Sequence, residues 1–126
     1  MNKNQNSKVY DLEGRTFDFA KKVRQFVKNL PKTVANIEDG KQLIRASGSI
    51  GANYIEANEA ISKKDFTLRI KISRKEAKES RFWLQLVDVG NEDELERKQE
   101  ELKQEATELM MIFSSIMRKS QSSNVY

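Results

Sequence analysis

The amino-acid sequence predicts an all-α fold, an antiparallel up-down-up-down four-helix bundle. The 126 residues include one proline and five glycines, and 33% are charged, a composition that favours long helices over strands and turns. Four stretches repeat apolar residues at spacings of three and four, as amphipathic helices do. The breaks between them are short, which forces neighbouring helices to run antiparallel. We expect one domain over residues 1–126, with its core at about 9–118 and flexible ends at 1–8 and 120–126.

The first helix is expected from about Arg15 to Leu30. Its apolar seam, spaced by three and four residues, comprises Ala20, Val23, Val27 and Leu30. Pro31 ends the helix, because proline disfavours helical geometry in the residue before it. Leu30-Pro31-Lys32-Thr33 is therefore predicted to form a tight corner.

The second helix is expected from near Thr33 to about Ala60, and it contains glycines in its interior. Each costs about 1 kcal/mol relative to alanine in a helix, so something must compensate. We predict close approach of a neighbouring helix at a run of small residues, namely Ala46, Gly48, Gly51 and Ala52. Gly48 and Gly51 also have the spacing of a KH-type RNA clamp. Because no strand context surrounds them and no charge lies between them, helix packing is favoured.

Local capping signals mark the ends of the last two helices. Ser62 and Asp65 form a capping box that opens the third helix, which continues to about Val89, with Gly90 as its left-handed cap. Asn91 is expected to cap the fourth helix, which ends near Lys119. The seam of this last helix comprises Leu95, Leu102, Ala106, Leu109, Phe113 and Ile116.

The third helix is apolar on two sides. One side faces the predicted core and comprises Phe66, Ile70, Ser73, Ala77, Ser80 and Leu84. The second side needs another cover, so we predict an oligomer interface at Leu68, Ile72, Phe82, Trp83 and Leu86. Trp83 beside Phe82 could also stack a nucleic-acid base, but aromatic residues on an apolar face are more often interface or core.

Charge is segregated by helix. The net charge is +4, yet residues 1–32 carry eight basic and three acidic groups, and residues 63–91 carry eight and four. On a helical wheel the third helix gathers four lysines within about 60°, with two arginines beside them. We predict nucleic-acid binding at Lys64, Lys71, Arg74, Lys75, Lys78 and Arg81. A second basic group on the first helix comprises Lys21, Lys22, Arg24 and Lys28.

The other interpretation of the basic stripe is structural. Its lysines would then pair with Glu76 and Glu79, or with the acidic first half of the fourth helix, as solvated charges commonly do.

The residue inventory disfavours an enzyme. There is no histidine and no cysteine, which excludes Ser-His-Asp and Cys-His nucleophile systems and ordinary structural zinc sites. A carboxylate metal cluster is conceivable, but only Glu56 and Glu59 share a helix face among the acidic residues that would form it, Glu56, Glu59, Asp65 and Glu76. We predict no catalytic residue, metal or cofactor. No apolar run is long enough to cross a bilayer or to form a signal-peptide core, so a cytoplasmic location is expected.

Several segments resemble one family. They are Tyr10-Asp11-Leu12-Glu13, Leu30-Pro31-Lys32-Thr33, Ser49-Ile50-Gly51-Ala52-Asn53, Ser62-Lys63-Lys64-Asp65-Phe66 and Lys75-Glu76-Ala77-Lys78-Glu79-Ser80. In this order and spacing they resemble the four-helix bundle proteins, also called 23S rRNA intervening-sequence proteins. The resemblance implies a small bacterial cytoplasmic protein that assembles into a ring, a homopentamer. A distantly similar bundle, the accessory protein of diversity-generating retroelements, binds nucleic acid and a reverse transcriptase.

Three functions follow as hypotheses. The first is a non-enzymatic oligomeric bundle that binds RNA or DNA through the basic surface of the first and third helices. The second is a scaffold or accessory subunit for a nucleic-acid-processing enzyme, without direct nucleic-acid contact. A small carboxylate-site enzyme is the third, and the missing residue types disfavour it.

Overall fold

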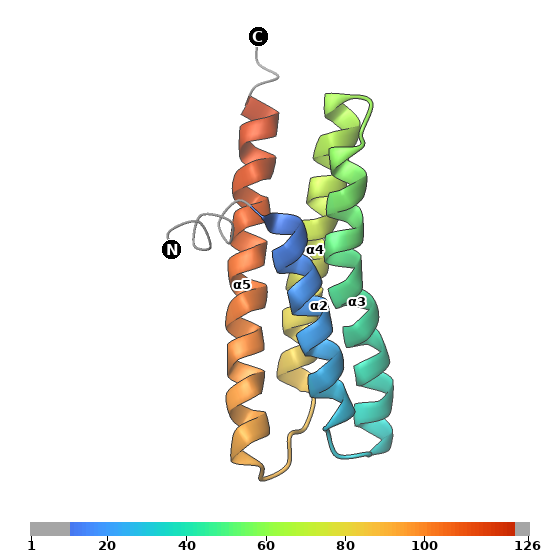
Figure 1. Cartoon of the computed structure of the whole chain (residues 1–126), viewed down its shortest axis with the longest axis vertical. Coiled ribbons are helices and arrows are strands. Elements are labelled where there is room, and N and C mark those ends of the chain that lie inside the picture. The colour runs from blue at the N-terminus through green and yellow to red at the C-terminus, as the bar shows by residue number, and fades with distance from the viewer. Residues whose placement is uncertain (1–10, 123–126) are drawn as a thin grey trace.

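The computed structural model describes residues 11–122, and these form a bundle of helices. In chain order the helices are α2 (Leu12–Lys28), α3 (Val34–Asn58), α4 (Lys63–Leu86) and α5 (Asp93–Ser122). The chain direction alternates from each helix to the next (Figure 1). The predicted up-down-up-down bundle is confirmed.

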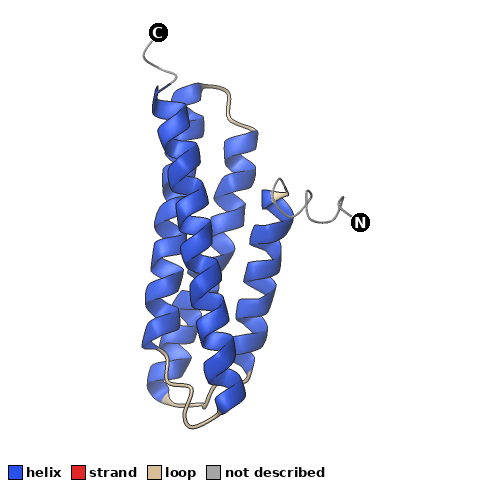
Figure 2. Ribbon diagram, turned by 90° about the vertical axis from the view of Figure 1, so that its left-hand side faces the viewer, coloured by secondary structure: helices blue, strands red, loops and turns tan. Residues whose placement is uncertain are grey.

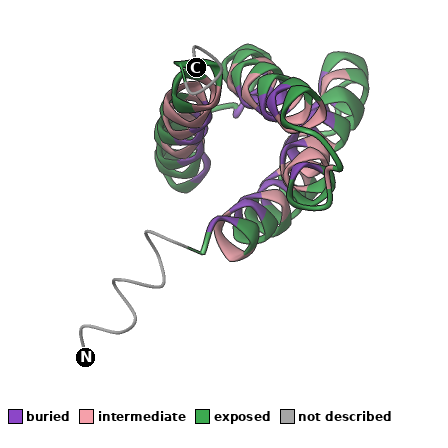
Figure 3. Ribbon diagram, turned by 90° about the horizontal axis from the view of Figure 1, so that it is seen from above, coloured by how far each residue is buried: buried purple, intermediate pink, exposed green. Residues whose placement is uncertain are grey.

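Each helix packs beside its neighbours in the sequence. The closest packing joins α3 to α4 and α4 to α5, while α2 packs on α3 and less extensively on α5. In the described part of the chain, the diagonal pairs α2 with α4 and α3 with α5 make no comparable contacts. The helices run nearly parallel to the long axis (Figure 2), and an end-on view shows buried residues along their inner sides (Figure 3).

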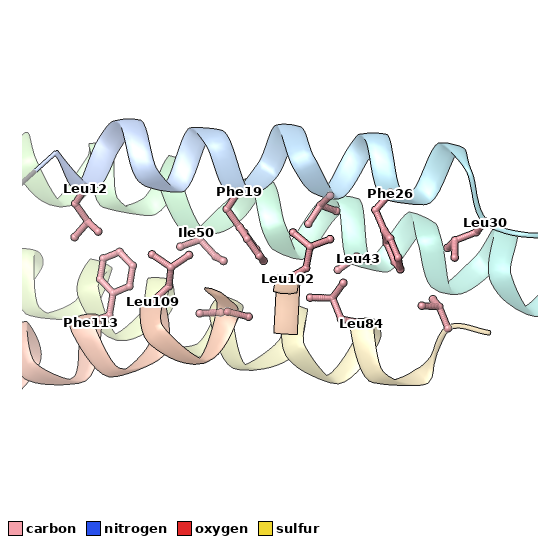
Figure 4. Packing of buried hydrophobic residues seen from close by; sticks show 14 of the residues in the cluster. Leu12, Phe19, Phe26, Leu30, Leu43, Ile50, Leu84, Leu102, Leu109 and Phe113 are labelled. Carbon is pink, nitrogen blue, oxygen red and sulfur yellow. The ribbon is translucent and has the colours of Figure 1, made fainter. Parts of the chain in front are cut away.

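A single hydrophobic cluster fills the bundle. Its largest fully buried apolar side chains are Phe19, Phe26, Phe113, Leu43, Ile50, Ile70, Leu84, Leu109 and Val23. Phe19 and Phe26 point inward from α2, and Leu109 and Phe113 reach the same interior from α5 (Figure 4). Burying one such side chain stabilises the fold by about 1.5–3 kcal/mol, so the apolar seams determine how the helices pack.

Helix α2 is the short member of the bundle. It has 17 residues, whereas α5 has 30, and at about 1.5 Å per residue the lengths are roughly 25 and 45 Å. Among residues 11–122, the end of the bundle beyond the start of α2 is therefore built from α3, α4 and α5 (Figure 1). Tyr54 of α3 and Phe113 of α5 meet edge to face, with ring centroids 5.7 Å apart, and Phe66 is partly buried beside the core.

Side-chain caps set the starts of α2, α3 and α4. The Asp11 carboxylate accepts from the Gly14 N–H at 2.9 Å, so α2 begins three residues before the expected Arg15. Thr33 and Ser62 cap α3 and α4, accepting from the N–H groups of Asn36 and Asp65 at 3.1 and 3.0 Å. The predicted cap at Ser62 is confirmed. These bonds satisfy N–H groups that the first helical turn leaves unpaired.

The predicted end of α4 is wrong. The helix stops at Leu86 rather than Val89, and Val87 is extended. Side chains that are distant in the sequence form hydrogen bonds with backbone groups at and after the end of the helix. Asn36 accepts from the Asp88 N–H at 3.0 Å and donates to the Asp88 carbonyl at 2.8 Å, and the Gln99 amide donates to the Leu84 carbonyl at 2.7 Å. Gly90 has φ of 70°, but it lies in the connecting loop and does not cap the helix.

The predicted bounds of the last helix also need correction. Helix α5 begins at Asp93, and the Glu96 N–H donates to the Glu92 carbonyl at 3.0 Å, so Asn91 is not its cap. The helix continues past Lys119 to Ser122, and the hydroxyls of Thr67 and Ser120 form a hydrogen bond. Residues 120–122, expected to be flexible, are therefore helical. The expectations for 1–8 and 123–126 lie outside the described residues.

The predicted close approach of a neighbouring helix is confirmed at Gly51, which lies against α2. A Cβ atom on Gly51 would lie 2.8 Å from Thr16 Oγ1, and Ala46 is fully buried. At Gly48 an added Cβ would make only an ordinary contact, and Ala52 is exposed, so the prediction was wrong there. Gly48 and Gly51 both lie inside α3, which excludes the loop geometry of a KH clamp.

Candidate nucleic-acid interface

Four lysines project from α4 on the side opposite its buried residues. Lys64, Lys71, Lys75 and Lys78 are all exposed, whereas Ile70, Ala77 and Leu84 of the same helix are fully buried. Within residues 11–122, none of the four ammonium groups lies within ion-pair distance of a carboxylate. The predicted lysine stripe is therefore present and open to solvent.

Several of the carboxylates proposed as partners for these lysines pair with other residues. Glu76 and Glu79 both pair with Arg45 of α3, and the Glu76 Oε2 to Arg45 Nη1 distance is 3.6 Å. At the acidic start of α5, Arg97 binds Glu101 at 2.5 Å. These contacts differ from the structural interpretation of the stripe, in which its lysines would pair with these carboxylates.

One buried polar atom near this network has no partner. Glu76 is 7% exposed, and within the described part of the chain its Oε1 atom accepts no hydrogen bond. The weak 3.6 Å pairing of its other oxygen with Arg45 leaves this carboxylate incompletely satisfied. Such a group lowers stability relative to a fully bonded one.

The two arginines predicted beside the lysines lie at the edge of the stripe. Arg74 and Arg81 are partly buried, and Arg81 Nη1 donates to Thr107 Oγ1 of α5 at 3.3 Å. Arg81 therefore also serves the packing of α4 on α5, unlike the lysines.

The predicted oligomer residues divide into two groups. Leu68, Phe82 and Leu86 are 53%, 56% and 53% exposed. Ile72 and Trp83 are partly buried, and the Trp83 indole N–H donates to Glu79, the residue that Arg45 of α3 also binds. Phe82 and Trp83 meet edge to face at 5.0 Å.

The exposed apolar residues and the lysines share one side of α4. Phe82 follows Lys71 by eleven residues, which places the two about 20° apart on the helix, and the same angle separates both Leu68 and Leu86 from Lys75. From the sequence we had predicted two separate surfaces. We call the combined surface the α4 outer face, and it comprises Lys64, Leu68, Lys71, Lys75, Lys78, Phe82 and Leu86.

The basic group of α2 is divided between two grooves. Lys21 lies 5.7 Å from the centre of the exposed Phe17 ring, and with Arg24 it lines a groove of about 640 Å³ between α2 and α3. Lys22 and Lys28 line a different groove, between α2 and α5. The structure thus brings the α4 lysines together and separates those of α2.

Two further observations concern metal ligands and helix apolarity. In residues 11–122, no three carboxylates converge as metal ligands. None of the four helices combines the length and apolarity that a bilayer crossing requires.

Fold and surface together define a class: a small four-helix bundle with a basic, partly apolar face on one helix. The family model described as 23S rRNA-intervening sequence protein matches residues 7–115. The chain belongs to this family, which confirms the resemblance seen in the sequence.

A solved structure supports this assignment. It is a protein of unknown function from the S23 ribosomal protein family of Bacteroides thetaiotaomicron VPI-5482. It has a TM-score of 0.72 and 30% sequence identity, and the match covers 83% of this chain and 96% of that chain. A search of curated proteins found no match.

Proposed function

We propose that this protein is a non-enzymatic, oligomeric helical bundle that binds RNA or DNA through the lysines of the α4 outer face. The observation that supports this most directly is the set of four exposed lysines without carboxylate partners in the described chain. Lys64 and Lys78 are 14 residues apart, or about 21 Å along the helix. A nucleic-acid duplex carries roughly twelve phosphate charges over that length.

Phosphate contacts of this kind position a nucleic acid without reading its bases. Their strength falls steeply with salt because binding releases condensed counterions. Arg74 and Arg81, at the α5 edge, extend the basic surface and would add contacts to a strand lying over that edge. The α2 lysines are a secondary surface in this proposal, because they are divided between two grooves.

The apolar residues of the α4 outer face support the oligomeric part of the proposal. Ile72 and Trp83 lie toward α3, while Arg74 and Arg81 lie toward α5. A second copy would cover the α3 edge and leave the lysines nearer α5 open. A closed ring, the homopentamer that the resemblance implies, would repeat the basic surface around its axis, so that the fields of the subunits add.

The non-enzymatic part rests on residue chemistry. The chain has no histidine or cysteine, and several of the described carboxylates, among them Glu105, Glu76 and Glu94, are paired with arginines of the bundle. The matching family and structure are not described as enzymes.

A protein-binding scaffold for a nucleic-acid-processing enzyme is the second candidate. The half-exposed Leu68, Phe82 and Leu86 favour it, because apolar side chains amid lysines suit a protein partner with a mixed surface. Capture of that partner would survive nuclease treatment and moderate salt, whereas phosphate contacts weaken as salt rises.

Charge reversal tests the nucleic-acid proposal. The variant changes Lys71, Lys75 and Lys78 to glutamate, and a matched control makes the same net charge change at Lys41, Lys103 and Lys119, which lie on α3 and α5. In fluorescence anisotropy with a short structured RNA, we expect the α4 variant to lose at least about tenfold in affinity at low salt. The control should lose far less. Equal losses in the two variants, or none in the α4 variant, would exclude the proposed site.

A further inference from the structure

A groove between α2 and α5 is separate from the α4 outer face. Its volume is about 450 Å³, and α2 is diagonal to α4 in the bundle. Its lining residues come from the half of α2 that leads toward α3 and from the early turns of α5, and Figure 1 shows the course of these two helices. The lining residues are Lys22, Gln25, Phe26, Lys28 and Asn29 of α2, with Lys98, Glu101 and Leu102 of α5.

The seam between these two helices changes its charge pattern along its length. Further along α5, opposite charges meet: Arg15 of α2 binds Glu105 at 2.7 and 2.8 Å and Glu108 at 2.7 Å. In the groove, by contrast, Lys22 and Lys28 of α2 face the same space as Lys98 of α5. Within the described chain, none of these three lysines has an ion-pair partner.

The groove contains little negative charge to offset its lysines. Glu101 is its one carboxylate, and Arg97 binds it at 2.5 Å. The α2 C-terminus also lies here, with a partial negative charge, but the Lys32 ammonium donates to the Lys28 carbonyl at 2.8 Å. Like charges that converge across a helix seam repel one another, and an anion seated between them would remove that repulsion.

The remaining lining suits such an anion. Gln25 and Asn29 place side-chain amides at the groove, and Asn29 uses one N–H for the Gln25 carbonyl at 3.0 Å. Phe26 and Leu102 form the buried floor, at 2% and 6% exposure. An apolar floor excludes water from one side of the ligand and strengthens its attraction to the lysines. The groove volume also falls in the range of about 300–1,000 Å³ found for small-ligand sites.

We infer that the α2–α5 groove is a binding site for a phosphate-bearing anion, held by Lys22, Lys28 and Lys98. The phosphates of a nucleic-acid strand and a free oligophosphate share the chemistry that would be recognised. This inference deepens the secondary α2 surface of the proposed function, and because it concerns a different face from the α4 lysines, it can fail while the α4 site holds.

The test is a titration of the isotopically labelled full chain with inorganic tripolyphosphate at constant ionic strength. The shifts of the backbone amide NMR signals report where the anion binds. We expect the shifts to concentrate at residues 22–29 and 98–102. The double variant Lys22→Ala and Lys98→Ala should bind at least about fivefold more weakly, while the control Lys41→Ala and Lys119→Ala, two exposed lysines of α3 and α5 outside this groove, should keep its affinity. Far-UV circular dichroism and the unfolding midpoint establish that both variants fold.

Shifts spread evenly over all exposed lysines, or unchanged affinity in the double variant, would overturn the inference. A short single-stranded RNA then identifies the source of the phosphate. If it displaces tripolyphosphate from the groove, the site contacts nucleic acid, and if it does not, the site takes a free oligophosphate. The Lys71, Lys75 and Lys78 charge-reversal variant should still bind tripolyphosphate in the groove, which separates this site from the proposed α4 function.

Discussion

At the scale of single residues, the interior glycines of α3 differ sharply in what surrounds them. Gly51 lies against Thr16 of α2, whose hydroxyl donates to the Leu12 and Glu13 carbonyls at 2.9 and 3.0 Å and therefore cannot easily move. Gly48 has room for a methyl group, since Arg24 Nη2 would lie 3.6 Å from an added Cβ. The sequence predicted that α3 glycines mark a helix contact, but their spacing alone could not say which of them does.

Alanine substitutions at these two glycines should therefore have opposite effects. Gly51→Ala should destabilise the fold by about 1–2 kcal/mol, because the overlap with Thr16 exceeds the gain in helix propensity. Gly48→Ala should stabilise it by about 0.5–1 kcal/mol, because only the propensity changes. Urea unfolding measures both values. Shifts of the same sign and size would show that the α2–α3 distance does not depend on Gly51.

A second prediction concerns pH and the Arg15 cluster. A hydrogen bond from Gln104, and then one from Arg15, lowers the pKa of Glu108 below its ordinary value of 4.5. The folded state therefore binds this proton less readily than the unfolded state. The resulting stability is present above pH 4.5 and is lost as the pH falls below it. The pKa of Arg15 is raised, chiefly by its hydrogen bond to Glu105, from a value already above the working range.

Glu108→Gln should therefore reduce the acid sensitivity of the fold. Between pH 6 and pH 3 the unfolding free energy of the variant should fall less than that of the unmodified protein. The difference should be at most about 0.5 kcal/mol, because the carboxylate is 47% exposed and screened by solvent. Thermal unfolding at several pH values measures it. An identical fall in both proteins would show that the interaction does not contribute.

At the scale of helices, the predicted helix ends were correct where the signal is local and wrong where the end depends on residues distant in the sequence. Ser62 and Thr33 cap helices through residues three positions away, so the start of α4 could be predicted. The end of α4 depends on Asn36, 52 residues distant, and on Gln99 of α5. No local pattern around Gly90 reveals these partners, which is why the predicted end was three residues too late.

We therefore expect the Asn36 side chain to contribute strongly to the stability of the fold. Asn36→Ala removes three side-chain hydrogen bonds, to the Pro31 carbonyl and to both backbone groups of Asp88. Because the site is buried and the backbone partners stay, we expect a loss of about 2–3 kcal/mol in unfolding free energy. Asn58→Ala, an exposed change with one weak contact to Glu13 at 3.5 Å, is the control and should be nearly neutral. Similar losses in both variants would contradict this account of the α4–α5 loop.

A further prediction concerns the role of the α4 outer face in assembly. Replacing Leu68, Phe82 and Leu86 with glutamine should lower the mass of the assembly without lowering the stability of the subunit, because these side chains are about half exposed. Sedimentation velocity measures the mass, and Met111→Gln on α5, 62% exposed, is the control. If the mass of the assembly is unchanged in the triple variant, the contact between subunits lies on another surface, such as the α2–α3 groove beside Phe17.

At the scale of the whole molecule, the antiparallel order followed from apolar periodicity and short connections. Two other features could not be predicted from these signals. The shortness of α2, which begins after the cap at Asp11 and ends before the corner at Pro31, leaves one end of the described bundle to three helices. The meeting of Lys22 and Lys98 across one groove depends on the relative axial positions of α2 and α5, which the spacing of residues within each helix does not determine.

The measurement that most directly tests the central claim is the mass of the purified assembly by light scattering. It is made with and without a short structured RNA, at low and at moderate salt. The account predicts an oligomer that gains RNA mass at low salt and loses it as salt rises, while the Lys71, Lys75 and Lys78 charge-reversal variant gains none. An assembly indifferent to RNA at low salt would contradict it, and so would equal binding by that variant.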